Sequence, residues 1–419
     1  MPSNTASHSP NGRREFLTRS LAGLAVLGSS FGPLERLFAA DDEAFPLGDA
    51  AFPPAGGFLM ESAPGPETVI NGKRVLYFGG TGYFALHGHP EVIEAGVAAF
   101  RKFGCHSATS RTGFGNTPVQ LELERRIAEF FGAEDSIHFV SGYLDNLFLV
   151  QALKAKATAI FIDETAHFSI RDAVYSALLP VHIYKHRDPE DLARQLKAKL
   201  KAGDTPLVMS DGIFPTFGVI APVPEYLKAL EPYGGYLCLD DSHAVGHLGP
   251  NGRGTYDYYG VKSDRCFYAG TMSKAFGGHG GFIPASKAFI DHIKAVCGAY
   301  PGATPSPTPA MAASLKGLEI VMREPQRRER LRRNVARIKT GLKKLGYDMN
   351  DTPVPIVTWV LKSPEAMKKV QKELFDRGIA VALLKYVGAP EGGVLRASIF
   401  SEHTTEQIDR LLAEMKRLG

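Results

Sequence analysis

The sequence has few cysteines, and no two of them have the spacing of a metal-binding or redox pair. Cys105, Cys238, Cys266 and Cys297 are scattered over 419 residues without a CxxC motif. Cys238 and Cys266 lie in apolar runs typical of buried strands, so we interpret them as small core residues. The pattern argues against a disulfide framework and against a cysteine-based metal site.

Strong charge and long apolar stretches are also lacking. The formal net charge is only +4, and no dense Lys/Arg run with interleaved aromatic residues occurs, so we expect no nucleic-acid partner. No apolar stretch is long enough to predict a stable membrane span. The remaining composition is ordinary for a soluble globular protein, and the length suggests two or three domains.

The N-terminus differs in kind from the rest of the chain. Arg13-Arg14-Glu15-Phe16-Leu17 precedes a mildly apolar stretch over 21–31 and small residues near position 40. This order resembles a bacterial twin-arginine export signal, with a disordered basic tail or a short amphipathic helix as the alternative. We expect residues 1–40 to be a twin-arginine-like signal segment and the protein to be periplasmic or exported; a cytoplasmic location is the alternative.

From Ser136 onward, short apolar runs alternate with helical patterns. The runs are continuously apolar rather than alternating, which is typical of strands covered on both faces. We predict an α/β fold with a mainly parallel sheet and helices on both faces, followed by a small C-terminal α+β domain. The expected strands of the sheet are 137–140, 159–162, 207–209, 236–239 and 266–269.

The chain is expected to have four parts. After the signal segment come an arm or linker with a first strand over 41–88, a large domain over 89–305 and a small domain over 306–419. Helices are predicted from Pro90 and over 117–131, 308–322 and 324–345. The small domain should end as strand, helix, strand, strand and helix, over 354–361, 364–377, 379–382, 394–399 and 405–418.

The run from Gly270 to Gly278 places Lys274 after an apolar strand, between the hydroxyls of Thr271 and Ser273 and a pair of glycines. A lysine amine forms a Schiff base only as the free base, which requires a partly dry site or nearby positive charge. The two hydroxyls could hold a phosphate or a phenolate oxygen. The pattern indicates a pyridoxal-phosphate lysine, although by itself it fits a surface lysine in a Gly-rich turn better.

Ligands of parallel α/β sheets bind beyond the carboxyl ends of the strands, so polar residues that follow the predicted strands are candidate site residues. Ser141-Gly142-Tyr143 follows the first of these strands and opens a helix whose N-terminal amides suit a phosphate. His167 follows the second strand and could lie over an aromatic cofactor and move protons. A lone histidine at such a place is more often only a hydrogen-bonded polar residue.

The fourth strand ends in Asp240-Asp241-Ser242-His243. A carboxylate at the end of a buried strand needs a partner, and a protonated pyridine nitrogen is such a partner. The alternative is a metal site of Asp240, Asp241, His243 and His247, but no further carboxylate or histidine cluster completes it, so we predict no metal. The order of helix start, histidine, Asp-x-x-His and lysine is the one expected of a class of pyridoxal-phosphate enzymes.

From about Asn71 to the C-terminus the chain resembles the α-oxoamine synthase family of the aspartate-aminotransferase-like, fold type I, pyridoxal-phosphate enzymes. Tyr83-Phe84-Ala85-Leu86 with His89-Pro90 is similar to the family's Tyr-Leu-Gly-Leu and His-Pro. The string from Asp240 to Gly246 with Gly252-Arg253-Gly254 is nearly the family's own, and residues 271–274 fit its Thr-x-Gly/Ser-Lys. Arg396 precedes His403-Thr404 as the family's carboxylate-binding arginine does.

The resemblance implies pyridoxal 5'-phosphate as the cofactor and a role for each site residue. Lys274 would be the Schiff-base lysine, Asp240 the pyridinium partner, His243 a donor to the ring phenolate and His167 the stacking residue. Arg396 would grip an amino-acid carboxylate. Family members are homodimers with sites at the subunit interface, so segment 304–308 would reach the partner's phosphate. The other expected cofactor-binding residues are Ser141, Gly142, Tyr143, Thr271 and Ser273.

Three places depart from the family pattern. Ala166-His167-Phe168-Ser169 stands where Asn-His-Ala-Ser is usual, and Phe-Pro-Thr-Phe-Gly at 214–218 stands where Phe-Ser-Met-Asp-Gly is usual. Gln120 replaces an expected histidine. The cofactor residues are therefore retained while the substrate-side wall is altered.

We expect an enzyme that acts at Cα of a small amino acid, by decarboxylative condensation with an acyl thioester. An exported enzyme would not meet cytoplasmic acyl-CoA, so a pyridoxal-phosphate-dependent aldolase, aminotransferase or racemase without an acyl donor is the alternative. A non-catalytic exported binding protein is a third hypothesis. The presence of Lys274, Asp240 and His243 together argues against it.

Overall fold

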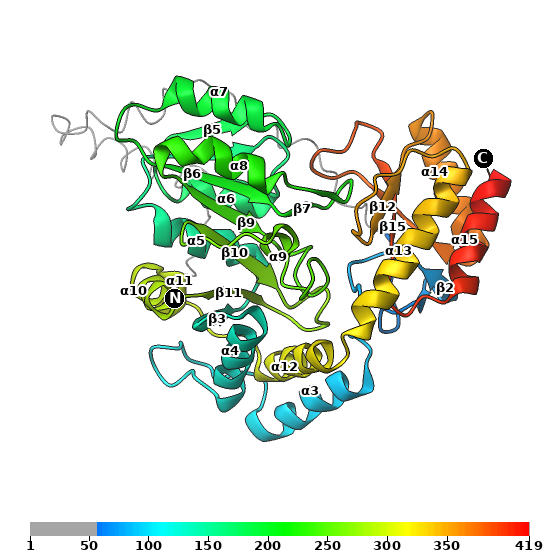
Figure 1. The fold of residues 1–419 in the computed structure, drawn as a ribbon. Helices are drawn as coiled ribbons and strands as arrows, with labels where there is room; N and C mark the ends of the chain where they lie inside the picture. Colours follow the sequence, from blue (N-terminus) through cyan, green and yellow to red (C-terminus); the bar gives the residue numbers. More distant parts are fainter. Residues whose placement is uncertain (1–56, 419) are drawn as a thin grey trace, which may run out of the picture. The chain divides into compact units, whose positions relative to one another are not determined.

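The computed structural model describes residues 57–418. A seven-stranded sheet with the order β3-β11-β10-β9-β6-β4-β5 lies at its centre (Figure 1). Pairing is parallel from β10 to β5, whereas β11 is antiparallel to both β10 and β3. The strands are β3 (Asp135–Phe139), β4 (Ala159–Asp163), β5 (Val181–Tyr184), β6 (Pro206–Asp211), β9 (Tyr236–Asp240), β10 (Cys266–Thr271) and β11 (Gly281–Ala285).

The expected mainly parallel sheet is confirmed, and each predicted strand of the sheet is present within two residues at its start and its end. The sheet also contains two strands that were not predicted, β5 and β11. β11 contains Gly281 and Pro284, residue types that are depleted in strands, and β5 is a short run interrupted by His182. Local propensity is therefore weak in β11, and the brevity of β5 leaves it without a clear apolar run.

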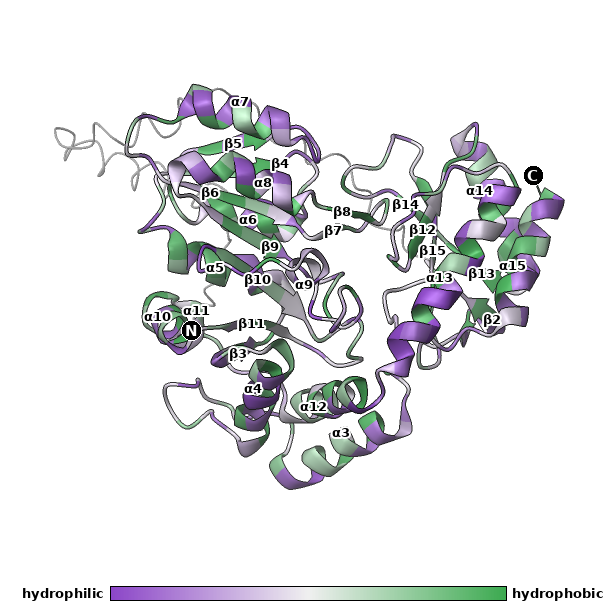
Figure 2. Ribbon diagram, in the orientation of Figure 1, coloured by the Kyte–Doolittle hydropathy of each residue, from purple (hydrophilic) through white to green (hydrophobic). Residues whose placement is uncertain are grey.

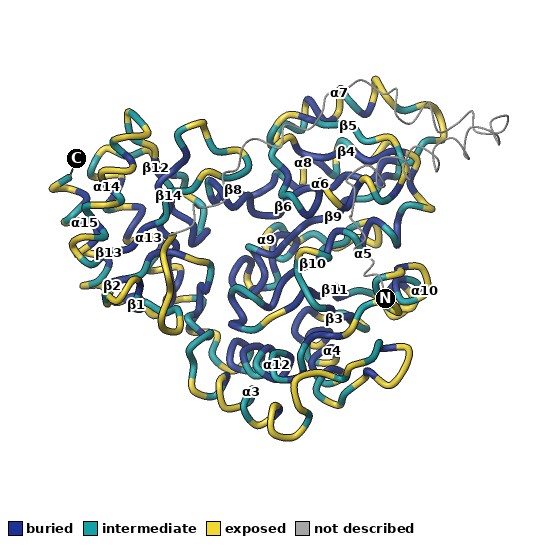
Figure 3. Tube along the Cα trace, turned by 180° about the vertical axis from the view of Figure 1, so that it is seen from behind, coloured by how far each residue is buried: buried dark blue, intermediate teal, exposed yellow. Residues whose placement is uncertain are grey.

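The inner strands of the large sheet are shielded from water on both faces. All residues of β4 and β6 are buried, as continuous apolarity predicts for strands covered on both faces. Figure 2 shows hydrophobic residues along these strands, and hydrophilic residues along α7 (Pro189–Lys199) and α13 (Gln326–Lys344). In Figure 3 the same strands are buried while the outer sides of the helices are exposed.

Helices pack on both faces of the sheet. α4 begins after Thr117, whose hydroxyl accepts a hydrogen bond from Gln120 N, and its predicted range is confirmed. α12 follows the predicted range 308–322 and packs on α3 and α4. The helices around the sheet are α3 (Pro90–Phe103), α4 (Pro118–Phe131), α5 (Asp145–Leu153), α6 (Phe168–Tyr175), α8 (Val223–Leu230), α10 (Lys287–Val296) and α12 (Thr308–Arg323).

The C-terminal part contains two small sheets and is α+β, as expected. Antiparallel β12 (Ile356–Trp359), β15 (Val394–Ser398) and β14 (Ala382–Leu384) form one sheet. The other joins β1 (Glu67–Ile70) and β2 (Lys73–Tyr77) to β13 (Ile379–Ala380), so the predicted strand 379–382 is divided between two sheets. The helices of this part are α13, α14 (Pro364–Asp376) and α15 (Thr405–Leu418).

The structure tests some of the remaining expectations. All four cysteines are free, with Cys238 buried and Cys266 partly buried. No helix among residues 57–418 is long and apolar enough to cross a membrane. The twin-arginine pair Arg13-Arg14 lies outside the described residues, and the three boundaries between the four expected parts of the chain stay predictions.

Candidate active site

The carboxyl ends of neighbouring strands bring the candidate residues to one edge of the sheet. Asp163, Asp211 and Asp240 are the last residues of β4, β6 and β9, and Asp211 is in register with Asp240. β10 ends at Thr271, three residues before Lys274. Parallel pairing therefore gathers residues that lie far apart in the sequence.

Asp240 is buried and has hydrogen-bond partners at both carboxylate oxygens. Its Oδ2 accepts from Asn146 Nδ2 at 2.9 Å and lies 3.2 Å from the Ser169 hydroxyl. Its Oδ1 accepts from Ser242 N at 3.2 Å. Such donors stabilise the ionised form, which is the form that can pair with a protonated pyridine nitrogen.

Lys274 is partly buried among three carboxylates, Asp240, Asp145 and Asp211. Burial lowers the pKa of Lys274 in spite of them. Burial alone would raise the pKa of Asp240, but His167, Lys274 and its hydrogen bonds together lower it. Burial, reinforced by the charge of Asp240, raises the pKa of Asp145 and Asp211 well above the usual range. Asp240 is thus the anionic carboxylate beside a lysine whose free base is accessible.

The start of α5 forms a cradle with the loop that follows β10. The Ser141 hydroxyl accepts from Tyr143 N at 3.2 Å and caps a 3₁₀ turn, η2 (Gly142–Leu144), that leads into α5. A Cβ on Gly142 would lie 2.9 Å from the Thr271 side chain, and Thr271 Oγ1 is 2.9 Å from Ser273 Oγ. The structure therefore brings together the residues predicted to hold the phosphate.

His167 lies at the N-terminus of α6 and is held from both sides. Its backbone N–H donates to Asp211 Oδ2 at 2.9 Å, and Nδ1 lies 2.7 Å from Ser169 Oγ. Its Nε2 lies 2.6 Å from the Tyr386 hydroxyl. Burial lowers the pKa of His167, so the ring is neutral at pH 7. Tyr386 was not among the predicted site residues, because no motif in its surroundings marks it.

His243 is held by a second unpredicted tyrosine. Its Nδ1 lies 2.8 Å from the hydroxyl of the fully buried Tyr83. Burial, with the charges of Lys274 and Arg396, places the pKa of His243 well below its usual range. A neutral imidazole that is fixed through Nδ1 has its other ring nitrogen available for a ligand.

The side chains of the alternative metal set do not converge. Asp241 accepts from the backbone N–H and the hydroxyl of Thr255, at 2.7 and 2.5 Å. His247 Nε2 lies 2.7 Å from the His243 carbonyl oxygen. Both residues therefore have structural partners. In residues 57–418 no group of three His, Cys, Asp or Glu side chains is placed to hold a metal ion.

Arg396, on β15, is a buried guanidinium without a carboxylate partner in the described chain. It is 8% exposed, and its only hydrogen bonds there are long ones to the carbonyl oxygens of Pro215 (3.3 Å) and Gly80 (3.4 Å). Its Nε has no partner in residues 57–418. A buried cation of this kind is costly unless an anion completes it, so the site suits a carboxylate ligand.

Comparison with known proteins supplies the family. The model for aminotransferase class I and II matches residues 80–415. The chain belongs to the aminotransferase class I and II family. It is 30% identical to 8-amino-7-oxononanoate synthase from Lysinibacillus sphaericus, over 86% of this chain and 93% of that protein. It is 32% identical to the synthase of the same name from Thermoanaerobacter pseudethanolicus, over 86% and 92%.

Solved structures agree with this assignment. Serine palmitoyltransferase from Sphingomonas wittichii superposes with a TM-score of 0.81 at 26% identity, and covers 98% of each chain. A lysine-to-alanine variant of serine palmitoyltransferase from S. paucimobilis, solved with a bound PLP-myriocin aldimine, gives the same TM-score at 27% identity and the same coverage. The fold type I architecture and the resemblance to α-oxoamine synthases are confirmed.

The site residues fit pyridoxal phosphate, the expected cofactor. Lys274 has a lowered pKa, Asp240 is kept anionic, and Gly142 leaves backbone room beside Thr271. The protein is a pyridoxal-phosphate-dependent transferase of this family.

Proposed function

We propose that the protein condenses a small α-amino acid with an acyl thioester and releases carbon dioxide, forming an α-amino ketone. The observation that carries this proposal is the buried Arg396 without a counter-ion, near Lys274 and Tyr83. An amino-acid carboxylate would supply the missing anion. The names of the relatives support the acyl transfer.

Each residue has a task in this reaction. Bound pyridoxal phosphate supplies an electron sink for negative charge at Cα. Asp240 keeps the pyridine nitrogen protonated, because its own pKa is lowered. Lys274, whose pKa is also lowered, holds the cofactor and then takes or returns the proton at Cα. Arg396 orients the substrate through its carboxylate.

The reaction can be tested with purified protein and a panel of small amino acids. Cα-proton exchange is followed by NMR with and without acyl-CoA, and release of free CoA reports the condensation. We expect exchange without the thioester and CoA release only with both substrates. Lys274→Ala should lose both signals and the visible absorption of the lysine-bound cofactor. Turnover that never depends on a thioester would reject the synthase and leave the aldolase, aminotransferase or racemase alternative.

We propose export for the N-terminal segment, on the strength of Arg13-Arg14-Glu15-Phe16-Leu17 and the weakly apolar stretch after it. Twin-arginine export carries folded proteins and would deliver the enzyme with its cofactor. Replacing Arg13 and Arg14 by Lys should retain the protein in the cytoplasm, as cell fractionation would measure. Unchanged export would reject the proposal.

We also propose a homodimer. Large apolar side chains on α3, on α4 and between them are exposed in one chain: Ile93 46%, Phe100 58%, Phe114 95% and Leu121 52%. In segment 304–308, the buried Ser306 hydroxyl has no partner within residues 57–418. Light scattering should give about twice the chain mass. Phe114→Asp should lower that mass, whereas a monomeric wild type would reject the dimer.

A further inference from the structure

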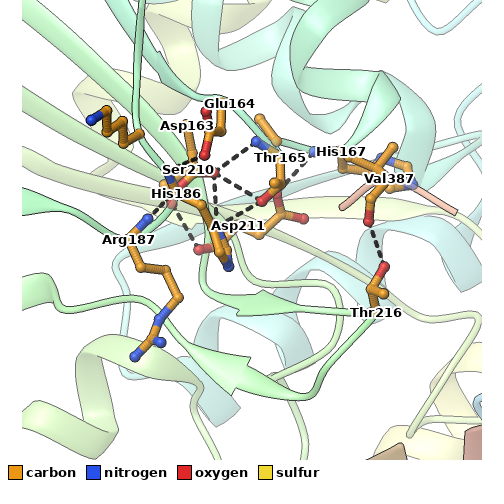
Figure 4. A network of polar contacts seen from close by, with 12 residues as sticks. Asp163, Glu164, Thr165, His167, His186, Arg187, Ser210, Asp211, Thr216 and Val387 are labelled. Carbon is orange, nitrogen blue, oxygen red and sulfur yellow. Dashed lines mark hydrogen bonds and ion pairs between the residues drawn. The ribbon is translucent and has the colours of Figure 1, made fainter. Parts of the chain in front are cut away.

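A short segment of the small C-terminal region lies across the strand-end loops of the large sheet. Figure 4 shows the Thr216 hydroxyl donating to the Val387 carbonyl oxygen at 2.5 Å. The next residue, Gly388, lies so close to Thr165 that a Cβ there would be 3.1 Å from the Thr165 methyl group. Thr216 belongs to the 214–218 stretch that departs from the family pattern.

The loop that receives this segment is held by several hydrogen bonds to Asp163. The Asp163 carboxylate accepts from Thr165 N at 2.8 Å, from the Thr165 hydroxyl at 2.9 Å and from Arg187 N at 2.8 Å. His186 Nδ1 lies 3.0 Å from the same carboxylate, as Figure 4 shows. The segment 386–388 is therefore placed on a fixed support beside His167.

Tyr386 is the residue of this segment that enters the site. Its hydroxyl lies 2.6 Å from His167 Nε2, and its ring meets the Phe168 ring edge to face at 5.5 Å. The side chain is only partly buried. Phe168 is itself a departure from the family pattern, where alanine is usual.

The other hydrogen bonds of His167 indicate which group is the donor in the contact between His167 Nε2 and the Tyr386 hydroxyl. Ser169 N donates to His167 Nδ1 at 3.2 Å, so this nitrogen carries no proton. The proton of the neutral ring is then on Nε2, and it is donated to the Tyr386 oxygen. With the His167 proton on Nε2, the Tyr386 O–H has no other acceptor within residues 57–418, which leaves its proton for a ligand.

Arg396 supplies a buried positive charge that interacts with Tyr386. β14 and β15 pair with Ala382 opposite Arg396, and Tyr386 follows β14 by two residues. Tyr386 and Arg396 interact electrostatically, and burial raises the pKa of Tyr386 to about 12, so that it stays a donor at neutral pH. A donor beside an uncompensated guanidinium suits an anionic oxygen.

We propose that Tyr386 is a substrate-binding residue whose O–H donates to a carboxylate oxygen of the amino acid held on Arg396. The inference rests on the proposed function, because it takes an amino acid as the substrate. His167 positions the phenol by donating to its oxygen. Thr216 and Thr165 hold the segment that carries it.

Tyr386→Phe tests the proposal, because it keeps the ring and removes the hydroxyl. The loaded enzyme is titrated with glycine, L-alanine and L-serine, and separately with methylamine, ethylamine and ethanolamine, which lack the carboxylate. Binding is read from the change in cofactor absorption, so only cofactor-loaded protein contributes. A hydrogen bond to a charged group corresponds to about a tenfold to hundredfold change in Kd. We expect that weakening for the amino acids and unchanged Kd values for the amines.

Two further variants complete the experiment. Tyr258→Phe, at an exposed tyrosine on α9 (Thr255–Tyr259), should leave every Kd unchanged. Thr216→Val keeps the phenol but frees Val387, and should weaken amino-acid binding by less than Tyr386→Phe does. Equal weakening for acids and amines, or no weakening in Tyr386→Phe, would overturn the inference. A wild-type enzyme that responds to no amino acid would overturn the proposed function as well.

Discussion

Asn146 donates its side-chain N–H to Asp240 Oδ2 over 2.9 Å, and both side chains are buried. Asn146 lies in the first turn of α5, directly after the Gly142 turn, and Asp240 ends β9. One helix start therefore serves two parts of the cofactor site. Its preceding turn places Gly142 against Thr271, where the phosphate is expected, and its first turn holds the carboxylate expected to pair with the ring.

Replacing Asn146 by Ala should weaken cofactor binding. Asp240 would lose a donor to its charged form, so its pKa would rise and its pairing with a protonated pyridine nitrogen would weaken. A charged hydrogen bond contributes about 1.5–3 kcal/mol, which corresponds to roughly a tenfold to hundredfold higher Kd for pyridoxal phosphate. Absorbance titration of the apoprotein measures it. Gln151→Ala, on the same helix and bonded to Ser176, is the control and should leave the Kd unchanged.

Gly142→Ala should also reduce the affinity for pyridoxal phosphate. The added Cβ would lie 2.9 Å from Thr271 Cβ and Oγ1, so the cradle must open to admit it. We expect roughly a tenfold higher Kd or more, because a displaced amide no longer reaches the phosphate. Gly298→Ala is the matched control, since nothing lies within 4 Å of its added Cβ. Equal affinities for the two variants would contradict a phosphate at Gly142.

Arg396→Lys should raise KM for the amino acid while the cofactor stays bound. Lysine cannot reproduce the two parallel hydrogen bonds of a guanidinium to a carboxylate, and we expect a loss of about tenfold to hundredfold. Steady-state kinetics measure KM, and the absorption spectrum reports the cofactor. Arg337→Lys, in the exposed ion pair with Asp409, should behave as wild type. An unchanged KM would place the carboxylate elsewhere.

The stability contributed by His403 should disappear in acid. Burial lowers its pKa from 6.5 to about 4, while Nδ1 accepts from Phe400 N at 2.9 Å. Between pH 6.5 and about 4, His403 is therefore protonated in the unfolded chain but not in the folded chain. The contribution is present above pH 6.5 and is lost as the pH falls toward 4. A shift of this size corresponds to about 3 kcal/mol.

Urea unfolding of wild type and His403→Gln between pH 4 and 7.5 checks this expectation. The difference in unfolding free energy between the two should shrink as the pH falls. Wild type and variant must be compared at each pH because other groups also change the unfolding free energy with pH. Burial raises the pKa of Asp241 to about 7, so the stability of the folded chain gains from Asp241 as the pH falls. A difference for His403→Gln that does not change with pH would refute the assignment.

Much of the cofactor site could be predicted because it lies in short local patterns. Lys274, Asp240 and Gly142 each follow an apolar run, and such a run marks a buried strand without any knowledge of its neighbours. The partners of these residues could not be found in this way. Asn146 and Tyr386 lie in ordinary stretches, and the motif that contains Tyr83 marks the family without giving this residue a role. Only their position beside Asp240, His167 and His243 gives these residues one.

The sequence by itself determined the kind of sheet, the residues at its carboxyl edge and the family. Continuous apolar runs require cover on both faces, and parallel strands place the residues that follow them at one edge. Only the tertiary structure decided the strand order and the long-range partners. Tyr386 contacts His167 although they are 219 residues apart in the sequence, and Asn146 contacts Asp240 although they are 94 residues apart. Contacts over such separations depend on how loops and small sheets pack, which no local periodicity encodes.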